Sequence, residues 1–325
     1  MAGVPDMDER KLIRAALTRW AAPAKSFVNQ SVLFQIFAAV GWGAFAWGIG
    51  QGVAAIAVHQ ESQAFFLMAL AGVAMRTIFL RLGDRCSALA GNAMTATARR
   101  EIFSALAQSG AGFLSGASPG ERTAQIIDRT AKLHLYAGNW LPGVRVAAAA
   151  PFVLLIAAAA QSWIAALLLA LSVVVLPLFI WLTASRTAEA AQAQQASLET
   201  LSGAFQSAAA HAGLIRAFRS INREAAALRQ ASEELRARTM GILRIAFLTS
   251  AVLEFFASIS IALVAVYVGF KLLGLFPFPT GEMVTLAEGL TALILAPEYF
   301  APIRRLSGLH HDRADGVAAA AAIAP

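Results

Sequence analysis

Three ionisable side chains lie inside or at the edge of long apolar stretches of this sequence, namely Arg76, Arg145 and Glu254. A charged group surrounded by hydrocarbon is costly, so each must face a cavity, a partner chain or the protein interior. A guanidinium can hold a carboxylate through two parallel hydrogen bonds, which makes the two arginines candidate ligands for an anionic group. Arg145 could instead extend to the membrane interface, and Glu254 could instead hydrogen-bond to a neighbouring helix. The sequence leaves these alternatives open.

The other candidate chemical groups favour structural roles. His310 and His311 are followed by Asp312 and Asp315. Adjacent histidines on a helix point in different directions, however, and no third ligand is suitably spaced. Cys86 is the single cysteine, so no internal disulfide can form, and a small buried residue is its ordinary interpretation. We therefore expect no metal site and no catalytic residue in this chain.

The stretches around these residues have the composition of membrane-spanning segments. Of the 325 residues, 58% are hydrophobic and 14% are charged, whereas an ordinary soluble domain is about a quarter charged. A spanning helix needs about 20 mostly apolar residues. Stretches of this kind cover approximately residues 28–58, 64–82, 140–160, 163–184, 245–273 and 283–303. The expected fold is an all-α membrane protein with six transmembrane helices surrounded by lipid.

The connections between these stretches alternate between short and long. The long ones follow the second and fourth stretches and are rich in good helix formers over residues 83–109 and 185–240, so helices should continue well beyond the bilayer. The long connections and both terminal segments carry nearly all the Lys and Arg residues, which predicts that they are cytoplasmic. The same bias accounts for the net charge of +7, and no nucleic-acid partner is expected.

We expect three parts along the chain. Residues 28–305 would hold the six spanning helices, and residues 306–325 form an alanine-rich tail. Residues 1–27 would form a cytoplasmic amphipathic elbow segment that lies on the membrane surface. This last expectation rests on apolar residues that recur at helical spacing, namely Leu12, Ile13, Ala16, Leu17 and Trp20.

Several motifs in this layout resemble the transmembrane domain of ATP-binding-cassette (ABC) exporters of type I. Both long connections carry such motifs, at residues 113–121, Asp128, Tyr136, Leu141-Pro142, 201–203 and 213–218. Closer matches resemble the CydD subunit of the heterodimeric CydDC thiol exporters and lie at residues 238–250, 253–256, 264–270 and 293–304. The chain departs from that family where Ser162-Trp163 stands in place of Asp-Trp.

The resemblance implies export of glutathione or cysteine from the cytoplasm to the periplasm by alternating access, in support of cytochrome bd assembly. It implies a bacterial inner membrane, a CydC-like second transmembrane subunit, and nucleotide-binding domains that use ATP and magnesium. No Gly-x-x-x-x-Gly-Lys-Ser/Thr loop occurs in the sequence, so no cofactor is expected in this chain itself, and haem binding stays open. We expect a fragment, a truncated product, or the membrane half of an ATP-hydrolysing translocase whose motor is encoded separately.

The resemblance also suggests roles for particular residues. Arg76, Arg145 and Glu254 would lie on the substrate path. Coupling to the nucleotide-binding domains would involve short helices at the two cytoplasmic tips, with Gly120, Glu121, Leu214, Arg216 and Phe218. Gly120 could instead be a simple turn residue after Pro119. The alternative for the whole chain is a non-transporting membrane scaffold or a truncated remnant of such a subunit.

Overall fold

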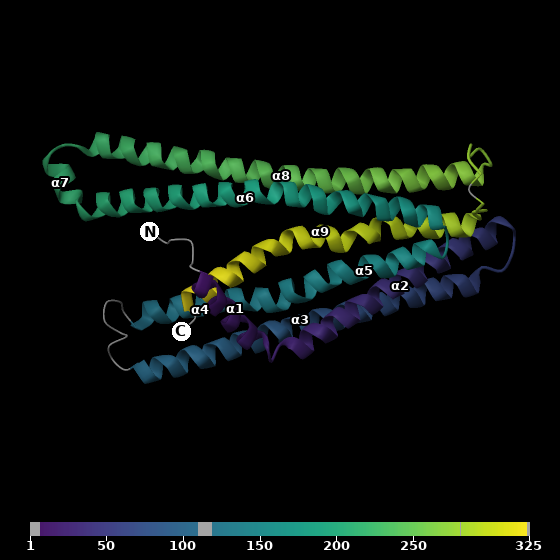
Figure 1. The fold of residues 1–325 in the computed structure, drawn as a ribbon, viewed down its shortest axis with the longest axis horizontal. Helices are drawn as coiled ribbons and strands as arrows, with labels where there is room; N and C mark the ends of the chain where they lie inside the picture. Colours follow the sequence, from purple (N-terminus) through teal and green to yellow (C-terminus); the bar gives the residue numbers. More distant parts are fainter. Residues whose placement is uncertain (1–6, 110–118, 280, 324–325) are drawn as a thin grey trace. The chain divides into compact units, whose positions relative to one another are not determined.

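The computed structural model describes residues 7–109, 119–279 and 281–323, and within these ranges every regular element is a helix. In chain order the elements are α1 (Met7–Ala21), α2 (Lys25–Ala57), α3 (Gln63–Ser109), α4 (Pro119–Leu135), the π-helical turn η2 (Tyr136–Trp140), α5 (Leu141–Ala159), α6 (Trp163–Ala210), α7 (Ala212–Ala217), α8 (Ile221–Leu272) and α9 (Leu286–Ile323) (Figure 1). The all-α fold predicted from the sequence is confirmed.

Three helices are much longer than a bilayer requires. α3 has 47 residues, α6 has 48 and α8 has 52. At 1.5 Å per residue each is about 70 Å or more in length, against a hydrocarbon core of about 30 Å. The prediction that the apolar stretches continue as helices through the long connections is therefore confirmed.

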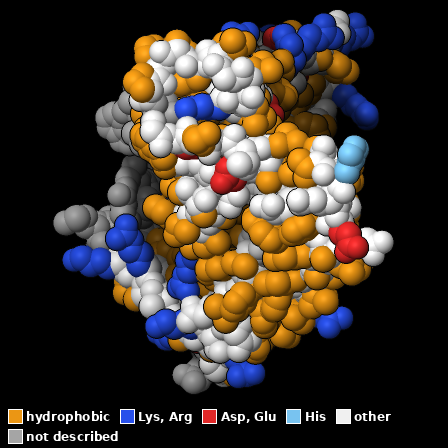
Figure 2. Space-filling view, turned by 90° about the vertical axis from the view of Figure 1, so that its right-hand side faces the viewer, with side chains coloured by type: hydrophobic (Ala, Val, Ile, Leu, Met, Phe, Trp, Pro, Cys, Tyr) orange, Lys and Arg blue, Asp and Glu red, His pale blue; other side chains and the backbone are white. Residues whose placement is uncertain are grey.

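Five helical segments in the described part of the chain are long and apolar enough to span a membrane, and they lie at Lys25–Ala57, Gln63–Ala105, Ile127–Ala159, Glu254–Leu272 and Leu286–Ile323. The predicted fourth span, residues 163–184, falls within α6. Its described apolar part is Trp163–Ser172, and the side chains of residues 173–192 lie outside the described set. Large apolar side chains are exposed along the five segments, among them Leu67, Leu70 and Ile156, as expected for a surface in contact with lipid. Hydrophobic side chains are also visible on the face drawn in Figure 2, which looks onto the end of the molecule where α2 connects to α3.

The helices divide into two compact units. Unit 1 comprises Met1–Leu169 and Ile261–Pro325, and unit 2 comprises Ala170–Ser260. In unit 1, α2 packs against α3, α5 and α9, and α5 also packs against α9. In unit 2, α6 and α8 contact each other through hydrogen bonds, one between Ser260 and Ser172 and one of 3.0 Å from Gln194 Nε2 to Thr239 Oγ1.

Glycines allow α2 and α3 to meet backbone to backbone. A Cβ atom on Gly72 would lie 2.6 Å from the Phe45 nitrogen and 2.7 Å from the Gly41 carbonyl oxygen. A Cβ on Gly48 would lie 2.7 Å from the Ala69 nitrogen. No side chain fits at such distances, so these positions require glycine, as is common where membrane helices approach closely.

The apolar face of α1 packs on protein, and the location of this helix at the membrane surface stays a prediction. Ile13, Ala16, Leu17 and Trp20 are buried in a cluster with residues of α3, α4 and α9, while Leu12 is 68% exposed. The Trp20 Nε1–H donates a 2.7 Å hydrogen bond to Glu101 on α3. The amphipathic pattern marked a buried face, and the protein supplies the apolar surface that covers it.

The alanine-rich tail is the end of α9. The helix continues to Ile323, and Ala319 and Ala320 are buried in the cluster that contains Trp20. Arg129 on α4 donates a 3.0 Å hydrogen bond to the Ala322 carbonyl. The small side chains of the tail therefore let the end of α9 pack closely against α1 and α4 (Figure 1).

Candidate functional site: a cavity between spanning helices

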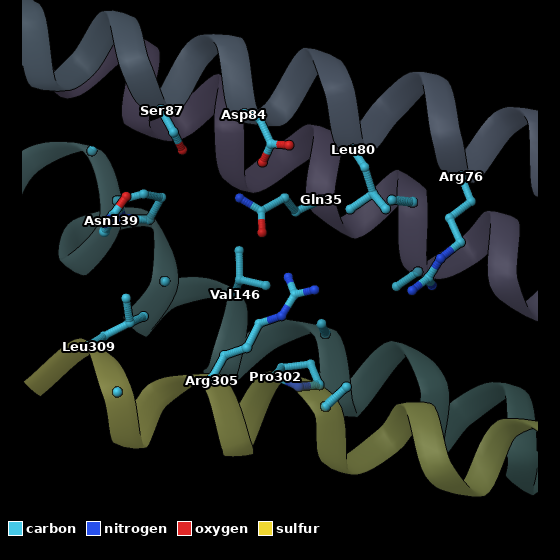
Figure 3. A pocket seen from close by; sticks show the side chains of 18 of the residues that line it. Gln35, Arg76, Leu80, Asp84, Ser87, Asn139, Val146, Pro302, Arg305 and Leu309 are labelled. Atoms are coloured by element: carbon cyan, nitrogen blue, oxygen red, sulfur yellow. The ribbon is translucent and has the colours of Figure 1, made fainter. Parts of the chain in front are cut away.

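A cavity of about 460 Å³ opens between α2, α3, η2, α5 and α9, all within unit 1 (Figure 3). Its volume lies within the range of small-molecule sites, about 300–1,000 Å³. The lining combines small, apolar and polar residues and includes Gln35, Ala38, Ala39, Arg76, Leu80, Asp84, Ser87, His134, Asn139, Val146, Leu154, Glu298, Pro302, Arg305 and Leu309.

Arg76 is the one predicted substrate-path residue that lines this cavity. Its Nη2 lies 2.8 Å from Glu298 Oε1 on α9, and the two side chains are only 19% and 22% exposed. The guanidinium carbon also lies 4.5 Å from the ring centroid of Trp42 on α2. Arg76 is therefore held by an ion pair and a cation–π contact, which offset the cost of placing its charge in an apolar region.

Glu298 lies in residues 293–304, one of the stretches that resemble the CydD subunit. The resemblance suggested no role for this residue. Arg76 and Glu298 are 222 positions apart, and their pairing follows only from the contact between α9 and the α2–α3 pair. The signal that could have found it is charge balance, because an arginine and a glutamate within two predicted spans are natural partners.

A second group of polar side chains lies elsewhere on the cavity wall. Gln35 on α2 donates a 3.1 Å hydrogen bond to Ser31 Oγ, which lies 2.8 Å from Ser87 Oγ on α3. Asp84 enters the cavity from α3 and Arg305 from α9 on the facing wall (Figure 3). The residue types and spacing in the sequence suggest no function for these five residues.

The π-helical turn shapes one end of the cavity. Residues Tyr136–Trp140 widen the helix between α4 and α5, and Gly138 and Asn139 from this turn line the wall. Single π-helical turns are rare in proteins, and those that occur are often found at functional sites. Asn139 Nδ2 also donates a 3.0 Å hydrogen bond to Asp312 on α9. This local widening has no clear sequence signature and was not predicted.

Arg145 has a different partner from Arg76, and Glu254 belongs to the other unit. Arg145 is exposed on α5, and its Nη1 donates a hydrogen bond to Asn29 Oδ1 on α2. It does not appear among the described residues that line the cavity. Glu254 lies on the part of α8 that belongs to unit 2 and is exposed, so the structure does not relate it to the cavity in unit 1.

The second predicted coupling tip is the short helix α7. Leu214 is 56% exposed and Phe218, directly after α7, is 79% exposed, and Arg216 is also exposed. Two large apolar side chains facing solvent suit a surface that another domain covers. Their contact with such a domain stays a prediction.

The first predicted tip is described only in part. Residues 110–118 of its motif lie outside the described residues. Gly120 and Glu121 belong to the first turn of α4, and Pro119 occupies the first helical position, where its fixed φ favours helix entry. Their side chains are outside the described set, so a role for them in coupling stays a prediction.

Other titratable groups make ordinary surface contacts. On the α8 segment in unit 2, hydrogen bonding and proximity to Arg236 lower the pKa of the exposed Glu233 carboxyl. Asp315 on α9 lies 3.4 Å from Lys132 and 3.7 Å from His311. Among the side chains that the structure describes, no group of three His, Cys, Asp or Glu residues could hold a metal ion.

A bundle of long helices around a polar-lined cavity between apolar spans defines a multi-pass membrane protein of the transporter type. Comparison with known families agrees. Residues 28–294 match the ABC transporter transmembrane region, and the chain therefore belongs to this family.

Particular relatives narrow the similarity. The chain is 38% identical over 259 residues to the glutathione/L-cysteine transport system ATP-binding/permease protein CydD of Escherichia coli, covering 79% of this chain and 44% of that protein. It is 34% identical to the CydD protein of Haemophilus influenzae over 80% of this chain and 44% of that one. It is 31% identical to the transport ATP-binding protein AarD of Providencia stuartii over 95% of this chain and 54% of that one. The chain thus spans about half the length of these relatives.

Proposed function

We propose that this chain is a membrane subunit of an ATP-driven exporter that moves cysteine- or glutathione-like thiols from the cytoplasm to the periplasm. The observation that carries the proposal is the cavity, which has Arg76 and other polar groups in its wall between helices able to span a bilayer. Similarity to proteins named for glutathione and L-cysteine transport supports the substrate class.

Arg76 would act at the substrate through exchange of partners. In the structure it is neutralised by Glu298. A substrate carboxylate entering the cavity would compete with Glu298 for the guanidinium, which can accommodate a carboxylate through two hydrogen bonds. Release of Glu298 from α3 would loosen one contact between α3 and α9, so substrate binding and helix rearrangement would be linked. Arg145 and Glu254 would act elsewhere on the path.

The driving force would come from nucleotide-binding domains that use ATP and magnesium. These domains would bind at α7 and at the start of α4, through residues such as Leu214, Arg216, Phe218, Gly120 and Glu121. A second, CydC-like transmembrane subunit would complete the pathway, because one set of six spanning helices would enclose only half of it. The complex would reside in the bacterial inner membrane with both termini of this chain in the cytoplasm.

The experiment is uptake of radiolabelled cysteine and glutathione by inverted membrane vesicles that contain the full complex. The proposal predicts uptake that requires ATP hydrolysis and that falls in Arg76→Ala and Glu254→Gln complexes of normal abundance. A wild-type complex that assembles and hydrolyses ATP but moves neither thiol would contradict the proposal and favour a scaffold role. Normal uptake by both variants would remove these two residues from the substrate path.

A further inference from the structure

We infer that the cavity recognises the zwitterionic amino-acid head of its ligand, with Asp84 binding the ammonium group and Arg305 binding the carboxylate. The inference rests on the proposed transport function and deepens it. The protein would recognise the charged groups on the α-carbon of the ligand rather than its thiol.

Asp84 and Arg305 provide opposite charges from facing walls. Figure 3 shows Asp84 entering from α3 and Arg305 reaching upward from α9, with Gln35 between them. Both residues line the cavity and are exposed. In the portion of the chain that the structure describes, neither of them takes part in an ion pair or hydrogen bond. The two charges are thus separate from each other and available.

The two charged side chains at the other end of the cavity already form an ion pair with each other. Arg76 and Glu298 lie 2.8 Å apart and neutralise each other. A ligand with only a carboxylate could pair with Arg305 but would leave Asp84 without a partner, and a simple amine would leave Arg305 without one. A ligand that carries both groups on one carbon satisfies both, and charge-assisted hydrogen bonds are stronger than neutral ones. The arrangement therefore favours a zwitterion.

Cysteine and glutathione share this group. Each has an α-ammonium and an α-carboxylate on the same carbon, in glutathione on the γ-glutamyl residue. One subsite could therefore accept both, with the rest of the ligand beside the apolar α5 wall of Val146, Ala150 and Leu154. None of the described lining residues is a cysteine, so the described wall offers no thiol–disulfide exchange with the ligand.

The test compares ligands that each lack one charge. ATP-driven uptake of radiolabelled cysteine is measured in inverted vesicles containing the full complex, with serine, N-acetylcysteine and cysteamine as competitors. Serine keeps both charges and lacks the thiol, N-acetylcysteine lacks the ammonium, and cysteamine lacks the carboxylate. For the wild type we expect serine to compete, and the two singly charged thiols to need about 10-fold higher concentrations than unlabelled cysteine.

Single substitutions should remove each preference separately. Asp84→Asn should raise the KM for cysteine about 10-fold and abolish discrimination against N-acetylcysteine while keeping discrimination against cysteamine. Arg305→Gln should show the opposite pattern. Arg85→Gln is the matched control, because Arg85 is exposed beside Asp84 and is not among the described lining residues.

The outcomes separate this inference from the transport proposal. If wild-type vesicles take up cysteine, but N-acetylcysteine and cysteamine compete as well as cysteine and serine does not, the zwitterion subsite is overturned and thiol transport stands. Because the competitors are tested on the wild type, they decide whether the zwitterion subsite exists even if a variant fails to assemble. If wild-type vesicles show no ATP-dependent uptake of either thiol, the transport function fails, and the subsite fails with it.

Discussion

At the scale of single residues, the central feature is the neutralised arginine in the cavity wall. The sequence identified Arg76 as a charge in an apolar setting, and this was enough to predict that it faces a cavity or a partner. It could not indicate that Glu298 and Trp42 hold it, because both contacts depend on how α2, α3 and α9 pack. The same limitation explains why Asp84 and Arg305 were overlooked. Charged residues near predicted span ends usually face water, and only the assembled walls place these two across one cavity.

The Arg76–Glu298 pair allows structural and functional roles to be separated. Arg76→Gln alone leaves the Glu298 carboxylate, which is only 22% exposed, without its partner. We expect this to lower stability by about 1–3 kcal/mol. Adding Glu298→Gln removes the unpaired charge and should restore most of the stability, measured as the Tm of the purified complex.

Transport by the double variant then tests the role of Arg76. If the guanidinium binds the substrate, cysteine uptake stays low in the double variant although its Tm has recovered. If the pair is purely structural, uptake recovers together with the Tm, and the assignment of Arg76 to the substrate path is wrong. Arg304→Gln, on the same helix as Glu298 and not a described lining residue, serves as the comparison for loss of an arginine.

At the scale of helices, local composition predicted length and type well but predicted packing partners poorly. The helix formers after residue 82 correctly indicated that α3 is uninterrupted to Ser109. The pattern in α1 correctly indicated an amphipathic helix, yet its apolar face is covered by protein. Periodicity shows that a face is apolar without showing what covers it. The π-helical turn η2 was missed because no residue type specifies it.

The glycine contacts between α2 and α3 give a prediction about helix packing. Gly72→Ala would place a Cβ 2.6 Å from the Phe45 backbone nitrogen, and backbone atoms cannot move aside as a flexible side chain can. We expect a loss of about 1–3 kcal/mol and a lower Tm. Gly269→Ala is the control, since a Cβ there meets nothing within 4 Å and alanine favours the helix. Equal Tm values for the two variants would contradict the close contact.

Burial of Trp20 predicts that α1 is fixed to the body of unit 1. Trp20 is 0% exposed and hydrogen-bonds to Glu101. Trp20→Ala should cost about 3–5 kcal/mol of local packing and should speed tryptic cleavage in the α1 segment, followed by mass spectrometry of the released peptides. Leu12→Ala should leave the cleavage rate near that of the wild type, because Leu12 is 68% exposed. Similar rates for Trp20→Ala and the wild type would argue against the packed position of α1.

At the scale of the whole molecule, the account depends on which side of the membrane the long helical segments reach. The family assignment and the five described spans establish a multi-pass membrane protein. The placement of Lys and Arg predicts that these segments are cytoplasmic, and this prediction needs no knowledge of packing because the membrane acts on each loop separately. The orientation itself stays a prediction. The cavity, in contrast, arises only from helices brought together from distant parts of the chain.

Cysteine labelling tests this arrangement directly, since Cys86 is the single cysteine and Cys86→Ser leaves none. In that background, Ser202→Cys reports on the exposed surface of α6 and Glu61→Cys on the connection between α2 and α3. With a membrane-impermeant maleimide, we predict that Ser202→Cys is labelled in inverted vesicles and protected in intact spheroplasts, and that Glu61→Cys shows the reverse. Labelling of Ser202→Cys in intact spheroplasts would place α7 away from cytoplasmic ATP and would contradict the exporter assignment.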